Sequence, residues 1–370
     1  MSEIKSFAKT LIIWQGQAGR TGLPWQGQKD PYRVWLSEIM LQQTQVQTVC
    51  ERYRIFLERY PHLASLAQAS EEDVMALWAG LGYYTRARNL LRCAQQIQQK
   101  YGGEFPQDAL TLATLPGIGK STAAAIAAFC FLERTSILDA NVKRLFARLY
   151  GISEPLNLTK TNQQLWGIAQ RALPASKTDM PQYTQGLMDF GATVCKPSKP
   201  RCLEPSQISH CIFQTHCQAY RQGQVDVIPY KVKKLQSPIV LSEMLLCIAQ
   251  GKVLLEKRLS SGIWGGLWSL PETSWQRVDQ FKEGQRAKSS FEDFQHILPN
   301  QLETVFKQGQ LFAPRKHLFT HRTLYFSVRV LQLKKLLPKL PTQYVWQPIS
   351  GIDQLGLPTP VKQLLIDLVI

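Results

Sequence analysis

The sequence lacks both a membrane-spanning segment and an export signal. Its longest unbroken apolar run, Ala123 to Leu132, is about half of the roughly 20 residues that a spanning helix needs. The first residues, Met1 to Lys5, lack the basic start, apolar core and cleavage site of a secretory signal. We therefore expect a cytoplasmic protein rather than a membrane or exported one.

Acidic residues are scarce relative to basic ones. The chain has 27 Asp and Glu against 43 Lys and Arg, a net charge of +16. The excess is shared, because residues 1–225 and 226–370 each carry a net charge of +8. Such a balance favours a polyanionic partner, usually nucleic acid, and the alternative is an ordinary enzyme that happens to be basic.

Close Cys-x2–4-Cys pairs, the usual mark of a zinc site, are absent although the chain has eight cysteines. Four of them are scattered among apolar neighbours and are expected to be small buried hydrophobes: Cys50, Cys93, Cys130 and Cys247. The other four fall within 23 residues as Cys195-x6-Cys202-x8-Cys211-x5-Cys217. Without an export signal, this spacing favours a metal site over disulfides, either a [4Fe–4S] cluster or zinc.

The chain has 370 residues, enough for two or three domains. In residues 1–225 apolar side chains recur at three- and four-residue spacing, which predicts a helical domain. Residues 226–237 are basic and contain proline, which is typical of a linker. Residues 238–370 carry short apolar bursts, such as Ile239–Ala249, and end in a helical pattern. We expect a smaller α+β domain there.

The segment from Leu115 to Phe129 reads Leu-Pro-Gly-Ile-Gly-Lys-Ser-Thr followed by an Ala-rich stretch. It predicts a helix up to Leu115, a tight Gly-x-Gly turn and a second helix from Lys120. The backbone amides of Gly117, Gly119 and the first helical turn are then free to bind phosphate. This is a helix-hairpin-helix pattern; the alternative is a tight turn between helices with no ligand.

Two carboxyl groups stand in settings that suit chemistry. Glu38 lies among Leu36, Ile39 and Met40, an apolar environment that raises a carboxyl pKa and suits a general acid. The alternative is an exposed Glu on an amphipathic helix. Asp139 lies between an apolar run and a basic helix, which is typical of a helix N-cap. A carboxylate in this place can also oppose a developing positive charge.

Two further stretches suit contacts with bases. Gln42, Gln43, Thr44 and Gln45 form a run of amide and hydroxyl groups, which can read base edges. The segment from Tyr83 to Arg88 places aromatic rings next to arginines, which can stack on bases and bind phosphates. The alternative for the second stretch is a tyrosine pair in the core with arginines at the surface.

Together these motifs resemble the helix-hairpin-helix DNA glycosylases with a C-terminal iron–sulfur loop, above all the adenine DNA glycosylases of the MutY family. The matching stretches are Leu23–Trp25, Tyr32–Val46, Leu77–Asn89, Leu115–Ala125, Ile137–Arg148 and the cysteine loop. The resemblance implies a mainly α helix-hairpin-helix glycosylase domain in residues 1–225. It also implies a [4Fe–4S] cluster in the loop 195–217, held by Cys195, Cys202, Cys211 and Cys217.

The last part of the chain carries a second resemblance. Ser261–Leu267 and His317–His321 are similar to the Nudix-like C-terminal domain of the same family, which recognises 8-oxoguanine opposite the target adenine. A hydrolytic Nudix box needs a cluster of glutamates, and the sequence has none between Gly266 and Phe291. We therefore expect a lesion-recognition domain in residues 238–370 and no nucleotide hydrolysis.

The resemblance also implies roles for single residues. Glu38 is the general acid that protonates the adenine, Asp139 opposes the oxocarbenium-like sugar, and Asn141 and Ser121 hold the pocket and its water. The remaining expected contacts are Trp25 and Leu41 in the pocket; Gln43, Thr44, Tyr83, Phe319, Thr320 and His321 around 8-oxoguanine; and Arg88, Gly117, Gly119 and Lys143 on the DNA.

Three positions depart from the patterns of this family and its relatives. The usual cysteine spacing is x6, x2, x5, whereas the middle gap here is x8. Ala140 stands where the family commonly has Gly. Endonuclease III-type enzymes place a nucleophilic Lys where this chain has Ser121, and serine cannot form a Schiff base. Lys120 comes one position early and should point elsewhere on its helix.

We therefore expect a monofunctional DNA glycosylase of base excision repair. Its partner is double-stranded DNA in which adenine is mispaired with 8-oxoguanine or guanine, and the enzyme is expected to be a monomer. Two alternatives stay open: an endonuclease III-like glycosylase and lyase for pyrimidine lesions, and a DNA-binding homologue without catalysis.

Overall fold

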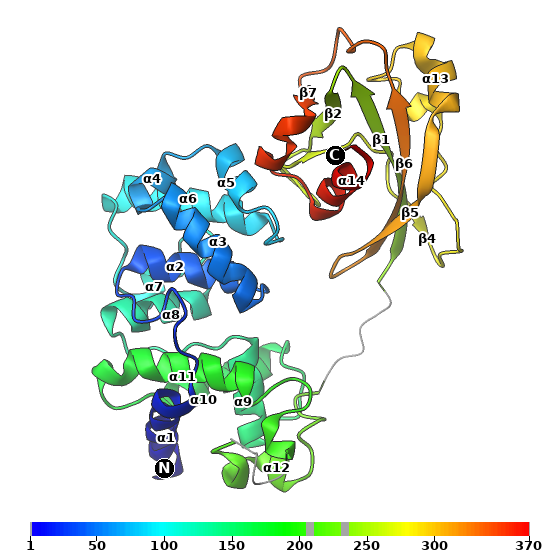
Figure 1. Ribbon diagram of the computed structural model, residues 1–370. Coiled ribbons are helices and arrows are strands. Elements are labelled where there is room, and N and C mark those ends of the chain that lie inside the picture. The colour runs from blue at the N-terminus through cyan, green and yellow to red at the C-terminus, as the bar shows by residue number, and fades with distance from the viewer. Residues whose placement is uncertain (1, 205–210, 231–236, 370) are drawn as a thin grey trace. The chain divides into compact units, whose positions relative to one another are not determined.

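A computed structural model describes residues 2–204, 211–230 and 237–369 (Figure 1). The chain forms two units with internal packing of their own, Met1–Ala69 with Asn89–Lys233, and Ser70–Arg88 with Lys234–Ile370. The first is helical and the second carries a mixed sheet, as the sequence predicts for the fold class. The segment Ser70–Arg88 groups with the sheet, although it precedes the sheet by some 150 residues in the chain.

The helical unit, coloured blue to green in Figure 1, is built from ten helices and part of an eleventh among the described residues. They are α1 (Ser2–Ala18), α2 (Pro31–Leu41), α3 (Val46–Arg59), α4 (Leu63–Ala67), α7 (Ala109–Leu112), α8 (Lys120–Phe131), α9 (Ala140–Tyr150), α10 (Thr159–Arg171), α11 (Met180–Thr193), α12 (Gln218–Arg221) and most of α6 (Thr85–Tyr101). Helix α11 packs against α1, α8 and α9, so it lies at the centre of this unit.

Local signals explain where the functional helices begin and end. Helix α2 begins with Pro31 and is capped by Asp30, whose side chain accepts a hydrogen bond from the Tyr32 amide. Helix α9 is capped by Asp139 and ends at Gly151, which adopts the left-handed conformation. The apolar side of α9 faces a core that includes Leu145 and Phe146. Helix starts therefore place Glu38 and Asp139 at fixed points of the unit.

The predicted hairpin consists of α7, a short turn and α8. Gly117 has φ +77°, and a Cβ atom at this residue would lie 2.8 Å from Cβ of Asn89. Both the backbone angle and the close approach of α6 therefore require glycine. Gly119 is the N-cap of α8, and no side chain caps that helix start. The backbone N–H groups in the first turn of α8 can therefore donate to a ligand or to solvent.

The second unit contains a seven-stranded mixed sheet of order β3-β2-β1-β6-β5, with β4 paired to β1 and β7 to β2. The strands are β1 (Ile239–Ala249), β2 (Lys252–Lys257), β3 (Trp268–Ser269), β4 (Gln276–Val278), β5 (Gln310–Leu318), β6 (Thr323–Gln332) and β7 (Tyr344–Pro348). Its helices are α5 (Glu71–Leu77), α13 (Glu303–Gln308) and α14 (Thr359–Val369). β1 and β6 run parallel over their length, and the other pairs are antiparallel.

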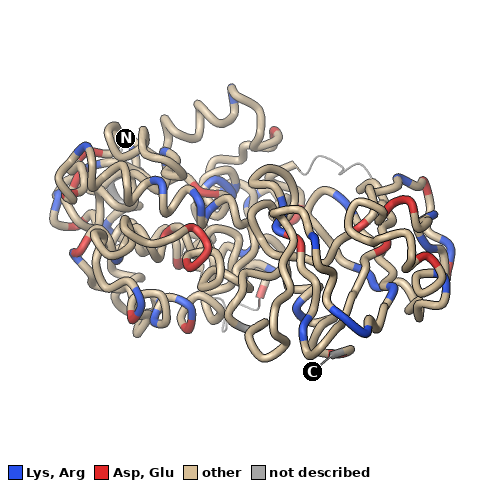
Figure 2. Tube along the Cα trace, turned by 90° about the horizontal axis from the view of Figure 1, so that it is seen from above, with Lys and Arg blue, Asp and Glu red and all other residues tan. Residues whose placement is uncertain are grey.

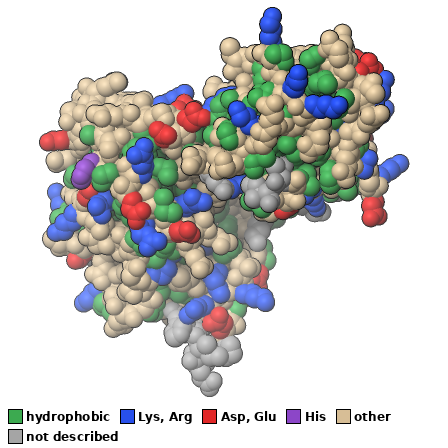
Figure 3. Space-filling model, turned by 45° about the horizontal axis from the view of Figure 1, so that its top comes forward, with side chains coloured by type: hydrophobic (Ala, Val, Ile, Leu, Met, Phe, Trp, Pro, Cys, Tyr) green, Lys and Arg blue, Asp and Glu red, His purple; other side chains and the backbone are tan. Residues whose placement is uncertain are grey.

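Two sequence predictions fall on residues outside the described part. The proposed linker 226–237 includes 231–236, and the lengthened cysteine gap includes 205–210. Basic residues occur along the described trace of both units (Figure 2). On the face shown in Figure 3 they are interspersed with acidic ones. The helices of the described residues are all too short or too polar to span a bilayer.

Candidate active site

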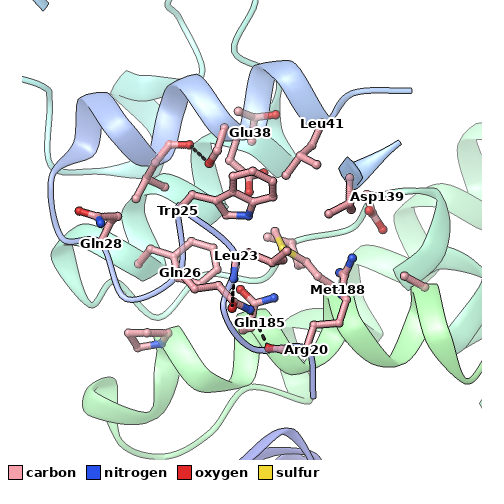
Figure 4. Close-up of a pocket in the computed structure, with 18 of the residues that line it drawn as sticks. Arg20, Leu23, Trp25, Gln26, Gln28, Glu38, Leu41, Asp139, Gln185 and Met188 are labelled. Carbon is pink, nitrogen blue, oxygen red and sulfur yellow. Dashed lines mark hydrogen bonds between the residues drawn. The ribbon is translucent and has the colours of Figure 1, made fainter. Parts of the chain in front are cut away.

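The helical unit contains a cavity of about 1290 Å³. Its walls include the loop 20–29, α2 with the turn that follows it, both ends of α8, the first turn of α9 and one side of α11 (Figure 4). Eight of the residues singled out from the sequence line it: Trp25, Glu38, Leu41, Gln43, Thr44, Ser121, Asp139 and Asn141. Residues that are more than 100 positions apart thus share one cavity.

Glu38 projects from α2 into this cavity (Figure 4). Its neighbours on the helix, Ser37 and Ile39, are buried. Burial raises the pKa of Glu38 from 4.5 to about 8, and the charge of Asp139 acts in the same direction. The carboxyl group is therefore protonated at neutral pH and can donate a proton, as a general acid must.

Asp139 both caps a helix and lines the cavity, which are the two roles that its place in the sequence suggested. One carboxylate oxygen accepts a hydrogen bond of 2.8 Å from the Val142 amide and caps α9. The same residue lines the cavity and lies close enough to Glu38 to raise the pKa of that carboxyl group. Capping fixes the Asp139 side chain at the helix start, where it can face a positive charge that develops in the cavity.

Ser121 and Lys120 begin α8 and point in different directions. The Ser121 hydroxyl lines the cavity and accepts a hydrogen bond of 3.0 Å from the Leu138 amide. The Lys120 ammonium lies 4.0 Å from the centre of the Trp166 ring, a cation–π contact, and Lys120 does not line the cavity. An amine nucleophile from this helix start is therefore directed away from the two carboxyl groups.

Asn141 follows Asp139 by two residues and is held by its neighbours. Its side-chain oxygen accepts a hydrogen bond of 2.8 Å from the Arg144 guanidinium, which also donates to the Gly191 and Cys195 carbonyl oxygens. A Cβ atom at Gly191 would lie 2.8 Å from Cβ of Asn141. Glycine therefore allows α11 to approach α9 at the cavity wall.

The four clustered cysteines pack into the same core as α9. Cys195, Cys202 and Cys217 are buried, and Cys211 is partly buried against them. A hydrogen bond between the Cys202 and Cys211 thiols lowers the pKa of Cys202 and raises that of Cys211. Burial raises the pKa of Cys217 to about 11, and Cys195 and Cys202 act in the same direction. Cys211 and Cys217 thus each lie near Cys195 and Cys202.

Two buried arginines of α9, Arg144 and Arg148, contact this cysteine group. Arg148 donates to the Cys195 sulfur at 3.5 Å and to the Lys196 carbonyl oxygen at 2.7 Å, while the Cys217 thiol donates to the Arg148 carbonyl oxygen. In the described ranges, no three Cys, His, Asp or Glu side chains are grouped for a single metal ion. A [4Fe–4S] cluster differs, because each thiolate binds a different iron atom.

Comparison with known proteins supports the same assignment. Residues 36–171 match the model of the HhH-GPD superfamily of base excision DNA repair proteins, and residues 243–367 match that of the NUDIX domain. The adenine DNA glycosylase of Buchnera aphidicola subsp. Baizongia pistaciae is 34% identical over 361 residues, which cover 97% of this chain and 95% of that protein. The human adenine DNA glycosylase is 31% identical, with 91% of this chain and 69% of the human chain covered.

This chain belongs to the adenine DNA glycosylase family, MutY. A thermostable thymine-DNA glycosylase is a further structural neighbour, with a TM-score of 0.53 and 28% identity over 60% of this chain and 98% of that one. An endonuclease III–DNA complex, at 19% identity and a TM-score of 0.50, shares the fold. This member of the MutY family is a DNA glycosylase of base excision repair.

Two departures from the MutY pattern can be located. Ala140 is the first residue of α9 and lies at the exposed rim of the cavity, and its backbone is helical. Because a helical residue has a negative φ, this position does not need glycine, and the Cβ of Ala140 causes no backbone strain. The lengthened gap between Cys202 and Cys211 falls largely on residues 205–210, outside the described part, while both flanking cysteines retain their contact.

The turn after α2 carries the other predicted base contacts of the MutY cavity. Gln43 has φ +57°, a left-handed conformation that is strained for a residue with a side chain. Gln42 donates to the Thr122 hydroxyl at 3.5 Å, which ties this turn to the start of α8. Trp25 packs edge-to-face on Tyr53, with ring centres 5.5 Å apart. The cavity walls are thereby linked to one another.

Five predicted contacts of this MutY enzyme belong to the sheet-bearing unit, and the structure contradicts the prediction for one of them, Arg88. Tyr83 is 43% exposed, whereas the adjacent Tyr84 is buried. Phe319 is partly exposed, and Thr320 and His321 are exposed at the turn between β5 and β6. Arg88 was predicted to contact DNA. It is instead buried, and its guanidinium donates to the Ser260 and Gly265 carbonyl oxygens.

Sequence reasoning missed several residues of this MutY cavity. Gln182, Gln185 and Met188 line it at three-residue spacing along α11, a helical periodicity that could have indicated a polar face. Arg20 also lines it and forms an ion pair of 2.7 Å with the fully buried Asp189. These two residues are 169 positions apart, so no local pattern links them.

Gln26 closes the turn that carries Trp25. Its amide nitrogen donates to the Arg20 carbonyl oxygen at 2.8 Å, and its amide oxygen accepts from the Leu23 amide at 3.0 Å. Both bonds span the turn, which Figure 4 shows below Trp25. The Gln26 side chain therefore fixes the backbone that presents the indole to the cavity.

Proposed function

We propose that this DNA glycosylase excises adenine mispaired with 8-oxoguanine or guanine and leaves the DNA backbone uncut. The observation that carries the proposal is the presence of Glu38 and Asp139 on one cavity, with burial keeping Glu38 protonated at neutral pH. Acid-catalysed cleavage of a glycosidic bond commonly uses two carboxyl groups, one as the proton donor and one beside the sugar. The names of the relatives support adenine as the base that is removed.

The target base has to leave the duplex before it can enter the cavity. Trp25 and Leu41 supply apolar contacts for a flipped purine, and α11 supplies amides. The Gln185 amide nitrogen is bonded to Asp189 at 2.9 Å, so its carbonyl oxygen is the group that can accept from the exocyclic amine of adenine. This arrangement favours adenine over a base with a carbonyl oxygen at that position.

The chemical step follows from the two carboxyl groups. Glu38 donates its proton to a ring nitrogen of adenine, so the N-glycosidic bond breaks with both electrons on a neutral leaving base. The sugar acquires oxocarbenium character, which the Asp139 carboxylate stabilises electrostatically. Ionised Glu38 then takes a proton from the water that adds to the sugar. Ser121 and Asn141 hold the wall around Asp139 in this step.

The endonuclease III-like alternative requires an amine that attacks the sugar. Ser121 occupies that place, and the Lys120 ammonium is held over Trp166. The start of α8 therefore places no amine where it could attack the sugar and form a Schiff base. This supports glycosylase chemistry without backbone cleavage.

Recognition of the opposite base and of the DNA backbone involves both units. We assign Gln43, Thr44 and Tyr83, with Phe319, Thr320 and His321, to the base opposite the adenine. The uncapped start of α8 at Gly117 and Gly119, together with Lys143, suits phosphate groups. The strained φ of Gln43 and Tyr83, +57° and +47°, supports a functional role for both turns.

The cysteine group fits a [4Fe–4S] cluster. Cys211 and Cys217 each lie near Cys195 and Cys202, and the Arg148 guanidinium at Cys195 can balance negative charge on the thiolates. When bound, the cluster cross-links the loop that carries Lys196, Lys199 and Arg201. Those side chains are then held for contacts with phosphates, and the cluster has no redox step in base removal.

The first test uses a duplex with one adenine opposite 8-oxoguanine, treated with enzyme and then with alkali. Strand scission at the adenine only after alkali is the expected result. Scission without alkali, or a covalent adduct trapped by borohydride, would establish the lyase alternative instead. Tight binding with no base release from any mismatch would establish the non-catalytic one. A parallel duplex with guanine opposite the adenine measures the preference for the oxidised base.

A further inference from the structure

The turn between β5 and β6 is short and presents two polar side chains. The Phe319 amide donates to the Arg322 carbonyl oxygen at 2.9 Å, directly beyond the last strand pair, Leu318 with Thr323. Thr320 and His321 occupy the exposed tip between them. Phe319 directly precedes this tip, so the contacts of its ring bear on how the tip is oriented.

Aromatic rings surround Phe319 on the protein side. Its ring centre lies 4.5 Å from that of His317, 5.3 Å from Trp264 and 5.9 Å from Trp275. The two tryptophan rings are themselves 6.2 Å apart and nearly perpendicular. These are the separations at which aromatic pairs attract one another. The Phe319 ring also lies 6.2 Å from that of the exposed His321, so it joins the rings of this cluster to the tip of the turn.

A partly buried ion pair contacts both tryptophans. The Arg258 guanidinium lies 2.5 Å from the Glu272 carboxylate, and the same carboxylate oxygen accepts from the Trp275 indole nitrogen at 3.0 Å. The Arg258 guanidinium also lies over the Trp264 ring, 5.7 Å from its centre. The guanidinium of Arg322, the last residue of the turn, lies over the Trp275 ring, 5.6 Å from its centre. The ion pair therefore contacts Phe319 only through the two tryptophan rings.

Trp264 has an unusual backbone. Its φ is +57°, and it lies between Gly262 at +85° and Gly266 at +75°. A tryptophan rarely adopts this conformation, and such strain persists only where the surroundings enforce it. The loop thus holds a large ring in a strained position directly against Phe319. A loop that only closed the fold could place glycine there without strain.

We infer that Trp264 and Trp275, held by the Arg258–Glu272 pair, are positioning residues for selection of the base opposite the target adenine. They fix the Phe319 ring, and this ring sets the direction in which Thr320 and His321 approach the base. The inference rests on the proposed function, because it concerns the preference for 8-oxoguanine over guanine. The sequence alone does not indicate this role for the two tryptophans or for the ion pair, because their contacts with one another appear only in the folded chain.

The test measures the discrimination ratio, defined as the single-turnover rate of adenine release opposite 8-oxoguanine divided by that opposite guanine. Both duplexes are assayed with the same preparation of each variant. A smaller fraction of folded enzyme therefore affects the two rates of adenine release equally and leaves their ratio unchanged. We expect Trp275→Ala and Glu272→Gln to lower the ratio at least tenfold. Trp275→Phe keeps a ring and should restore most of it.

The matched control is Trp346→Phe. Trp346 is a partly buried tryptophan of β7, on the same sheet, that packs against a different apolar cluster. This variant should keep the wild-type ratio. If Trp346→Phe lowers the ratio as much as Trp275→Ala does, the effect comes from the sheet as a whole and the inference is wrong.

A double-mutant cycle tests whether Trp275 acts through Phe319. In the Phe319→Ala background, Trp275→Ala should cause no further loss of discrimination. If Trp275→Ala lowers the discrimination ratio by the same factor in the Phe319→Ala background as in the wild type, the two residues act independently and the inference is wrong. A wild-type enzyme with no preference for 8-oxoguanine would instead refute the opposite-base part of the proposed function. A wild-type preference that survives Trp275→Ala would refute the positioning role alone.

Discussion

The hydroxyl of Ser121 accepts a hydrogen bond of 3.0 Å from the backbone amide of Leu138, the residue before Asp139. This bond joins the first turn of α8 to the segment that delivers the second carboxyl group to the cavity. Ser121 thus has a positioning role for Asp139 in addition to its place on the cavity wall.

Replacement of Ser121 by Ala should disturb catalysis more than folding. Loss of one hydrogen bond costs about 0.5–1.5 kcal/mol of unfolding free energy. The excision rate should fall several-fold because the Asp139 segment loses its tie to α8. Ser136→Ala is a matched control, since the Ser136 hydroxyl donates to the adjacent Ile137 carbonyl oxygen in the same segment and Ser136 is not among the residues that line the cavity. An equal slowing in both variants would contradict the positioning role. Urea unfolding and single-turnover assays provide the two measurements.

The excision rate should depend on pH through Glu38. Its pKa of about 8 means that the proton-donating form predominates below pH 8 and is lost above it. The single-turnover rate should therefore fall as pH rises through about 8, with a slope approaching tenfold per pH unit. A rate that stays constant up to pH 9.5 would show that another group donates the proton.

Glu38→Gln should abolish base release and stabilise the protein in alkali. The Glu38 pKa is 4.5 in the unfolded chain and about 8 in the folded one, so the folded protein holds this proton more tightly. The resulting stabilisation is complete below about pH 4.5 and is lost as pH rises through 8. Glutamine stays neutral throughout. Urea unfolding should therefore show similar stabilities at pH 4.5 and a more stable variant at pH 9; a variant less stable than wild type at pH 9 would contradict the assignment.

Asp139→Asn should separate capping from catalysis. The Asn side-chain oxygen can still accept the Val142 amide, so unfolding free energy should change by less than about 1 kcal/mol. Base release should fall by orders of magnitude, because the carboxylate that opposes the sugar charge is gone. Asp108→Asn is the matched control, since Asp108 caps α7 through Thr111 with the same geometry outside the cavity. Near-wild-type turnover in Asp139→Asn would refute the electrostatic role.

Removal of a cysteine from the loop should remove iron from the protein. Cys202→Ala should lower the iron content measured by elemental analysis and weaken binding to a duplex, most strongly at low salt. Cys93→Ala is the control, because Cys93 is equally buried but lies among apolar residues of α6. Full iron content in Cys202→Ala, or equal loss in both variants, would show that the loop does not hold the cluster.

Local patterns predicted the parts of the site that depend on helix starts and turns. Asp139 shows this well, because an acid between an apolar run and a basic helix marks a cap, and the cap is what places it. The hairpin glycines were visible for the same reason. Glu38 was recognisable from its apolar neighbours, although its proximity to Asp139, 101 positions later, depends on how α2 and α9 pack.

Long-range partners were not predictable in the same way. The burial of Arg88 depends on carbonyl oxygens of Ser260 and Gly265, and a sequence shows neither the carbonyl directions nor the approach of the two segments. The Arg20–Asp189 pair and the aromatic rings around Phe319 were missed for the same reason. In each case the chemistry of the residues was evident and the partner was not.

The grouping of Ser70–Arg88 with the sheet has a consequence for synthesis on the ribosome. Arg88 emerges 172 residues before Ser260, its hydrogen-bond acceptor. At about 5–20 residues per second, it waits roughly 10–30 s for that partner. During this interval its guanidinium and the neighbouring Tyr84 ring are exposed to solvent and to other nascent chains. The sheet-bearing unit, to which Ser70–Arg88 belongs, therefore cannot be completed until Ser260 and the strands around it have been synthesised, and a stalled or truncated chain would display this unfinished surface.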